Sequence, residues 1–152
     1  MGFTITEETK AIAVQTALRP GENCRAVAYC VLMGGNMTAA YLIGGAIGGA
    51  LAAGANKYGF AILTDYSLKI VIVSNMNTSK VKDVYDIPYG DIEKMKYSKG
   101  MLKTHNFKFK LNKRRYKLIL NENAGKKIQN QKENVDIFIR FFTNMQNAQK
   151  AS

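Results

Sequence analysis

The chain has 152 residues, of which 47% are hydrophobic and 10% aromatic. This composition predicts a single domain over residues 1–152 with its own apolar core, and it excludes a disordered chain. The formal net charge is +11, from 22 Lys and Arg against 11 Asp and Glu, so we expect anionic partners.

The first predicted element is a short helix over residues 6–18. Thr6 is a typical N-cap, and Glu7 and Glu8 favour the positive end of the helix dipole. Residues 19–22 (Arg-Pro-Gly-Glu) end the helix, because proline cannot continue the hydrogen-bond ladder and glycine favours a turn. The charged residues of this helix leave no apolar core for a secretory signal, so we expect a cytoplasmic protein.

A strand is predicted next, over residues 24–33, because nearly every position there is apolar. Cys24 and Cys30 both lie in it, and an extended chain would hold their Cα atoms roughly 20 Å apart, too far for a disulfide. We expect both cysteines to be reduced thiols in the core.

A Gly- and Ala-rich insert follows at residues 37–56. Between residues 38 and 55 there are seven alanines, five glycines and no charge. Four of the glycines have overlapping small-xxx-small spacing: Gly44, Gly45, Gly48 and Gly49. This spacing lets helices pack closely, so we predict a helical insert that assembles subunits or enters a membrane. Three interpretations stay open: a helix buried against the domain or a sister subunit, a helix inserted in a bilayer, and a mobile loop.

Apolar alternation and turn signals predict six more strands. They cover residues 60–64, 69–75, 84–87, 92–98, 107–111 and 116–120. The last element is a helix over residues 134–146, capped by Asn134. Its apolar stripe consists of Val135, Phe138, Ile139, Phe142 and Met145. Such a stripe predicts a helix that lies against the sheet.

Four short segments stand out at the ends of the predicted strands: residues 18–22 (Leu-Arg-Pro-Gly-Glu), 61–65 (Ala-Ile-Leu-Thr-Asp), 68–70 (Leu-Lys-Ile) and 87–92 (Ile-Pro-Tyr-Gly-Asp-Ile). These segments resemble those of bacterial pleckstrin-homology-like (PH-like) domains. The resemblance implies a mainly β, α+β fold: a seven-stranded barrel of two orthogonal antiparallel sheets with a C-terminal capping helix. This chain would add the N-terminal helix and a helical insert between strands one and two.

The same resemblance implies a binding role and frequent oligomers. Members of the wider superfamily bind phosphoinositide headgroups, phospholipids or peptides. In the lipid-binding eukaryotic members the basic residues lie between strands one and two, where this chain has glycine and alanine. We therefore do not expect phosphoinositide recognition to carry over to this chain.

The basic residues instead gather late in the sequence. Residues 94–117 contain ten Lys and Arg and no Asp or Glu. Phe107 and Phe109 share one strand face and Lys108 and Lys110 the other, so we expect the aromatic rings in the core and the lysines in water. The cations predicted to contact phosphate belong to one hairpin and its tip: Lys108, Lys110, Lys113, Arg114, Arg115 and Lys117. Part of this charge also suits an edge hairpin that avoids aggregation.

Residues suited to catalysis are scarce. His105 is the only histidine. It lies among polar neighbours in residues 103–106 (Lys-Thr-His-Asn), and we interpret it as a solvated turn residue. The chain has no second histidine and both cysteines are expected in the core, so none is available to complete a triad or a zinc site. The sequence therefore predicts no enzyme, no cofactor and no metal site.

These observations predict a non-catalytic PH-like adaptor that self-assembles and associates with an anionic phospholipid surface. It would be cytoplasmic, and peripheral to or anchored at the inner face of the cell membrane. One alternative is a soluble oligomeric scaffold that binds an acidic protein partner. A nucleic-acid-binding module is the less favoured alternative, in which aromatic rings among the basic strands would stack on bases.

Overall fold

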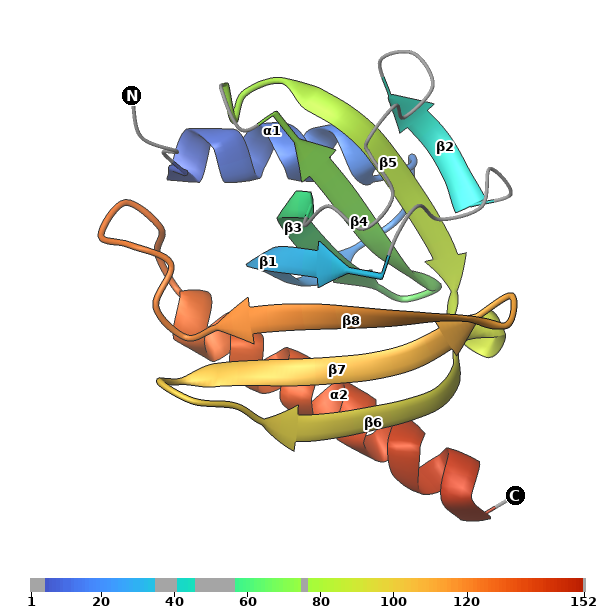
Figure 1. Ribbon diagram of the computed structural model, residues 1–152. Helices are drawn as coiled ribbons and strands as arrows, with labels where there is room; N and C mark the ends of the chain where they lie inside the picture. The colour runs from blue at the N-terminus through green and yellow to red at the C-terminus, as the bar shows by residue number, and fades with distance from the viewer. Residues whose placement is uncertain (1–4, 35–40, 46–56, 75–76, 152) are drawn as a thin grey trace.

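The computed structural model describes residues 5–34, 41–45, 57–74 and 77–151, and Figure 1 shows their arrangement. The helices are α1 (Glu7–Ala17) and α2 (Gln131–Ala151), and a 3₁₀ turn covers Tyr89–Asp91. The strands are β1 (Cys24–Met33), β2 (Leu42–Gly45), β3 (Lys57–Thr64), β4 (Ser67–Val73), β5 (Val81–Pro88), β6 (Glu93–Lys99), β7 (Thr104–Leu111) and β8 (Arg114–Asn121). The α+β class and all seven predicted strands are confirmed.

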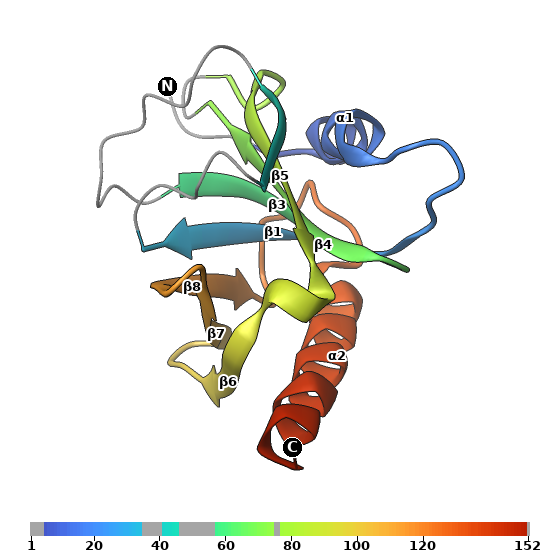
Figure 2. The same cartoon turned by 90° about the vertical axis from the view of Figure 1, so that its right-hand side faces the viewer.

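The strands form one antiparallel sheet in the order β2-β5-β4-β3-β1-β8-β7-β6. A closed barrel was expected, but among the described residues the end strands β2 and β6 do not pair, so the sheet is not closed. β1 pairs with β3 from Cys24 to Leu32 but with β8 only from Cys30 to Met33. The two halves of the sheet therefore separate along the first part of β1, as Figure 2 shows.

Helix α2 lies in the space where the two halves separate. The backbone N–H of Val27 donates to Asn134 Oδ1 at 3.1 Å, and that of Tyr29 donates to Gln131 Oε1 at 3.1 Å. These β1 groups lack a neighbouring strand there, and the helix supplies the acceptors that buried backbone requires. Asn134 was predicted to cap the helix; it lies inside the first turn of a helix that begins at Gln131, and its side chain bonds to β1.

The same helix also covers the outer edge of β6. Met95 N–H donates to Gln149 Oε1 at 2.7 Å, and Tyr97 N–H donates to Gln146 Oε1 at 2.9 Å. Gln149 Nε2 in turn donates to the carbonyl of Ile92 at 2.9 Å. The edge of β6 is thus occupied by side chains, which discourages pairing with another chain.

Replacing Gln146 and Gln149 together by alanine should uncover this edge. Each lost hydrogen bond should lower the free energy of unfolding by about 1 kcal/mol, because water replaces the amides only in part. Hydrogen exchange at the amides of Met95 and Tyr97 should accelerate by more than the lowered free energy of unfolding alone would cause. Unchanged exchange at these two amides would show that the glutamines do not protect the edge.

Two apolar cores lie on opposite faces of the sheet. The larger one packs α2 against the inner faces of both halves, and its buried aromatic residues include Phe107, Phe138 and Phe142. The smaller one packs Ala13 and Ala17 of α1 against the outer face of β3, β4 and β5. No described residue of β6, β7 or β8 belongs to the smaller core. No described helix therefore covers the outer face of β6–β8.

The predicted helix at residues 37–56 is wrong where the structure describes it. Leu42–Gly45 form strand β2, in which Leu42 pairs with Tyr85 and Gly45 with Asp83 of β5. Glycine is a poor helix former, and the open edge of β5 offers backbone groups that a strand can satisfy. Gly44 and Gly45 therefore do not form a helix contact, while Gly48, Gly49 and the rest of the insert lie outside the described residues.

The two cysteines differ in their surroundings. Cys30 is a buried free thiol, as expected, whereas Cys24 at the start of β1 is exposed, which corrects the prediction of a core residue. Among the helices of the described residues, none is long and apolar enough to cross a bilayer.

Residues 19–22, which follow α1, are held by a buried ion cluster. Lys69 of β4 is fully buried, and its Nζ lies 3.1 Å from Glu22 Oε1 and 3.2 Å from Asp86 Oδ1. Arg19 reaches the other oxygen of Asp86 at 3.0 Å. The turn after α1 is therefore attached to the centre of the β3–β5 half by opposite charges.

Candidate anion-binding groove

Three lysines form a row across the outer face of β6–β8. Lys96 of β6 is directly opposite Lys108 of β7, and Lys108 is directly opposite Lys117 of β8. Cβ atoms of directly opposite residues are about 5 Å apart, so three positive charges lie side by side. Like charges in this arrangement repel, which is unfavourable for folding.

A second group of cations lies beside this row. Lys110 of β7 is opposite Arg115 of β8, and Lys94 is brought near them by an irregularity in β6 between Glu93 and Lys96. Lys94 has a left-handed backbone, with φ of 53°. The positive charges of Lys94 and Arg115 hold the pKa of Lys110 below its ordinary range. Strong positive potential at Lys110 is the cause, and a bound anion would relieve it.

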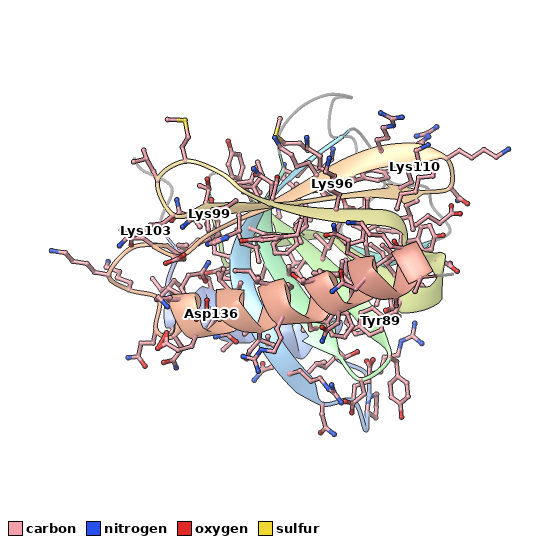
Figure 3. All side chains as sticks on the ribbon, turned by 90° about the horizontal axis from the view of Figure 1, so that it is seen from below. Tyr89, Lys96, Lys99, Lys103, Lys110 and Asp136 are labelled. Atoms are coloured by element: carbon pink, nitrogen blue, oxygen red, sulfur yellow. The ribbon has the colours of Figure 1, made fainter. Side chains whose placement is uncertain are left out.

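The two groups line one open groove with a volume of about 560 Å³. Its cations are Lys94, Lys96, Lys108, Lys110, Arg115 and Lys117. None of the described residues that line it is acidic. Figure 3 shows Lys96 and Lys110 on the β6–β8 layer, with α2 running along its other side. We call these six residues and the space between them the basic groove.

Gly34 allows the chain to leave β1 close to the basic groove. Its φ is +126°, and a Cβ there would lie 2.5 Å from the carbonyl oxygen of Arg115 and 2.9 Å from the Cα of Tyr116. Only glycine fits this close approach to β8 without displacing backbone. Gly34 and Met33 form part of the groove wall.

Four of the six cations predicted from the hairpin lie in the groove: Lys108, Lys110, Arg115 and Lys117. Lys113 belongs to the β7–β8 turn and Arg114 is the first residue of β8, and neither is among the residues that line the groove. Lys94 and Lys96 were not among the cations predicted to contact phosphate. The alternation of residues along β6 only weakly indicated that Lys96 belongs to the groove. The register between β6 and β7 is needed to place Lys96 beside Lys108.

The groove is chemically suited to phosphate groups. Lysine and arginine donate charge-assisted hydrogen bonds to phosphate oxygens, and six cations can share several such groups. No acid, base or nucleophile lies among the described lining residues in an arrangement for catalysis. The repulsion between these cations would be relieved by a bound anion.

His105 is not the solvated turn residue that was predicted. It lies within β7 with 4% of its surface exposed, and its two ring nitrogens have separate partners. Nδ1 lies 2.6 Å from Tyr97 Oη, and Nε2 lies 2.7 Å from Glu122 Oε2. These two contacts of His105 link β6, β7 and the end of β8 on the side of the sheet that faces α2. Burial, followed by the charges of Glu122 and Asp136, raises the pKa of Tyr97, which disfavours a reactive phenolate.

The hydrogen bond from His105 lowers the pKa of Glu122. A carboxyl whose pKa is depressed by folding stabilises the fold above its ordinary value of about 4.3, and this contribution is lost as pH falls through the depressed value. Glu122→Gln should therefore reduce the drop in melting temperature between about pH 7 and about pH 3. Thermal melts of both proteins at a series of pH values test this, and equal acid sensitivity would contradict it.

Within the described residues, no group of three or more His, Cys, Asp or Glu side chains is placed to hold a metal ion. Comparison of the sequence with family models found no match, and a search of curated proteins found none either.

Proposed function

We propose that this protein is a non-catalytic module that binds an anionic phospholipid surface through the basic groove. The observation that carries this proposal is the position of six cations, with no acidic lining residue, on a sheet face that no described helix covers. Each Lys or Arg near an anionic leaflet contributes roughly 1 kcal/mol of attraction. Six such groups acting together are sufficient for stable electrostatic association.

A lipid surface accounts for these residues better than nucleic acid. Phe107 and Phe109, between the groove lysines in sequence, are buried in the core at 0% and 2% exposure. They are not available as a platform for stacking bases. Tyr116 is buried as well, at 3% exposure. A positively charged groove without exposed aromatic rings suits the phosphates of lipid headgroups better than the bases of nucleic acid. The headgroups present anions over a broad surface.

The strand order supports a PH-like relationship as part of this proposal. Seven strands, β1 and β3 to β8, precede the helix α2, which is the order that the resemblance implies. β2 is then an addition between the first and second strands of that order. Self-assembly also belongs to the proposal, although the glycine spacing that suggested it falls on β2 or outside the described residues.

Co-sedimentation with vesicles tests the proposal directly. The purified protein is mixed with neutral phosphatidylcholine vesicles and with vesicles that also contain phosphatidylglycerol, at low and at high salt. We expect binding only to the anionic vesicles, with affinity that falls as salt rises. Light scattering in parallel gives the mass of the free protein and tests self-assembly. Absence of binding to anionic vesicles, or tighter binding to duplex DNA at equal salt, would overturn the membrane proposal.

A further inference from the structure

Two large apolar side chains project into water at the turn between β6 and β7. Met101 is 81% exposed and Leu102 is 87% exposed, the two highest values among the exposed large apolar residues of the described chain. They are adjacent in sequence and flanked by Lys99 and Lys103. Single exposed apolar residues are normal on a protein surface, but an adjacent pair at a turn tip is not explained by folding.

The turn holds this pair in a defined position. Thr104 N–H donates to the carbonyl of Met101 at 3.1 Å, and Gly100 N–H donates to the carbonyl of Thr104 at 2.9 Å. The carbonyl of Lys103 accepts from the N–H of Glu122 at 3.0 Å, which joins the turn to the end of β8. Three backbone hydrogen bonds therefore fix a tight hairpin turn, and the apolar pair is not part of a long loose loop.

The backbone of this turn is unfavourable for the residues it contains. Leu102 and Lys103 have φ of 52° and 64°, in the left-handed region. Two consecutive left-handed residues are typical of hairpin turns built from Asn-Gly, whereas leucine crowds its own backbone there. A residue that is both strained and exposed gains nothing from packing in the free protein. Neither packing nor backbone preference therefore accounts for a leucine at this position.

The charges around the pair indicate which surface it meets. Lys99 and Lys103 lie at the end of the β6–β8 layer opposite to Lys96 and Lys110, as Figure 3 shows. The basic groove and the turn are thus connected by the strands β6 and β7. A phospholipid interface offers anionic headgroups directly above an apolar phase, which matches apolar tips flanked by lysines.

We propose that Met101 and Leu102 enter the interfacial region of an anionic bilayer while Lys99 and Lys103 stay among the headgroup phosphates. This inference rests on the proposed function and adds an apolar anchor to it. Attraction at the basic groove is screened by salt, whereas burial of the apolar pair is not. The anchor therefore accounts for any binding that remains at high salt.

The chain contains no tryptophan, so one introduced residue reports on its own surroundings. Leu102→Trp places this reporter at the β6–β7 turn, and Met101→Trp is a second reporter at the same tip. Tyr66→Trp is the matched control, because Tyr66 is 70% exposed at the β3–β4 turn. With phosphatidylglycerol-containing vesicles, the turn reporters should shift their emission to the blue and be quenched by brominated acyl chains. The control should show neither effect.

A second variant tests the native side chains. Met101→Ser with Leu102→Ser should weaken vesicle binding at high salt by about tenfold or more, because two buried side chains are lost. At low salt the loss should be smaller. If the wild-type protein binds anionic vesicles but the turn reporters show no shift or quenching, the anchor is overturned and the proposed function stands. If the wild-type protein does not bind them, the proposed function and the anchor both fail.

Discussion

Replacing Lys96, Lys108 and Lys117 together by glutamine is expected to weaken binding to anionic vesicles by about two orders of magnitude. These three residues form the row of directly opposite lysines across β6, β7 and β8. Each contributes roughly 1 kcal/mol near an anionic leaflet, so the loss is about 3 kcal/mol. Co-sedimentation at low salt measures it, and the dependence of affinity on salt should flatten as well.

The matched control changes the same number of lysines elsewhere. Lys80, Lys126 and Lys127 are exposed and lie outside the groove, so their replacement by glutamine alters net charge equally. If binding depends only on net charge, both variants will lose affinity to the same degree, and the groove is then not the binding site.

The row variant should also fold more stably than the wild-type protein. Removing the lysines relieves repulsion between directly opposite like charges, which is worth a few tenths of a kcal/mol for each pair. A raised midpoint in urea unfolding together with weaker vesicle binding would separate the loss of function from any loss of structure. A lowered midpoint would show that the lysines stabilise the sheet.

The second large effect is expected at Lys69. Lys69→Ala should lower the free energy of unfolding by about 3–5 kcal/mol, because it leaves the buried carboxylates of Glu22 and Asp86 without their shared cation. The side chains of Glu22 and Asp86 are only 8% and 14% exposed, so water does not replace the ammonium group fully. Urea unfolding curves measure the loss.

Two further variants separate charge from packing at this position. Lys69→Met keeps most of the volume, so a loss similar to that of Lys69→Ala would identify the missing charge as the cause. Lys80→Ala is the control at an exposed lysine and should change stability by less than about 0.5 kcal/mol. If Lys69→Ala behaves like Lys80→Ala, the ion cluster does not hold the turn after α1.

The positions of the strands along the chain were predictable because the sequence patterns that indicate a strand are local. Alternation at Phe107, Phe109 and Leu111 identified the inner face of β7, and all three residues are buried. The helix α1 begins where the Thr6 cap predicted it, with Thr9 N–H donating to Thr6 Oγ1 at 3.2 Å. Such features depend on neighbours within a few residues, which the sequence displays directly.

The insert and His105 show where local reasoning failed. Small residues between 37 and 56 favoured a helix, yet Leu42–Gly45 pair with β5, a strand about forty residues later in the chain. His105 was interpreted from its polar neighbours, whereas its burial results from Tyr97 and Glu122 on adjoining segments. In both cases distant backbone or side chains decided the outcome.

Periodicity and composition along the chain were enough to predict the seven strands, the N- and C-terminal helices and the concentration of positive charge between residues 94 and 117. Which cations share a surface depends instead on how the strands pair in the folded protein. Register placed Lys96 beside Lys108 and Lys117, and an irregularity in β6 brought Lys94 toward Lys110, while Lys113 and Arg114 were left out. The physical reason is that charges act through space, and pairing between strands sets the distances that spacing along the chain does not.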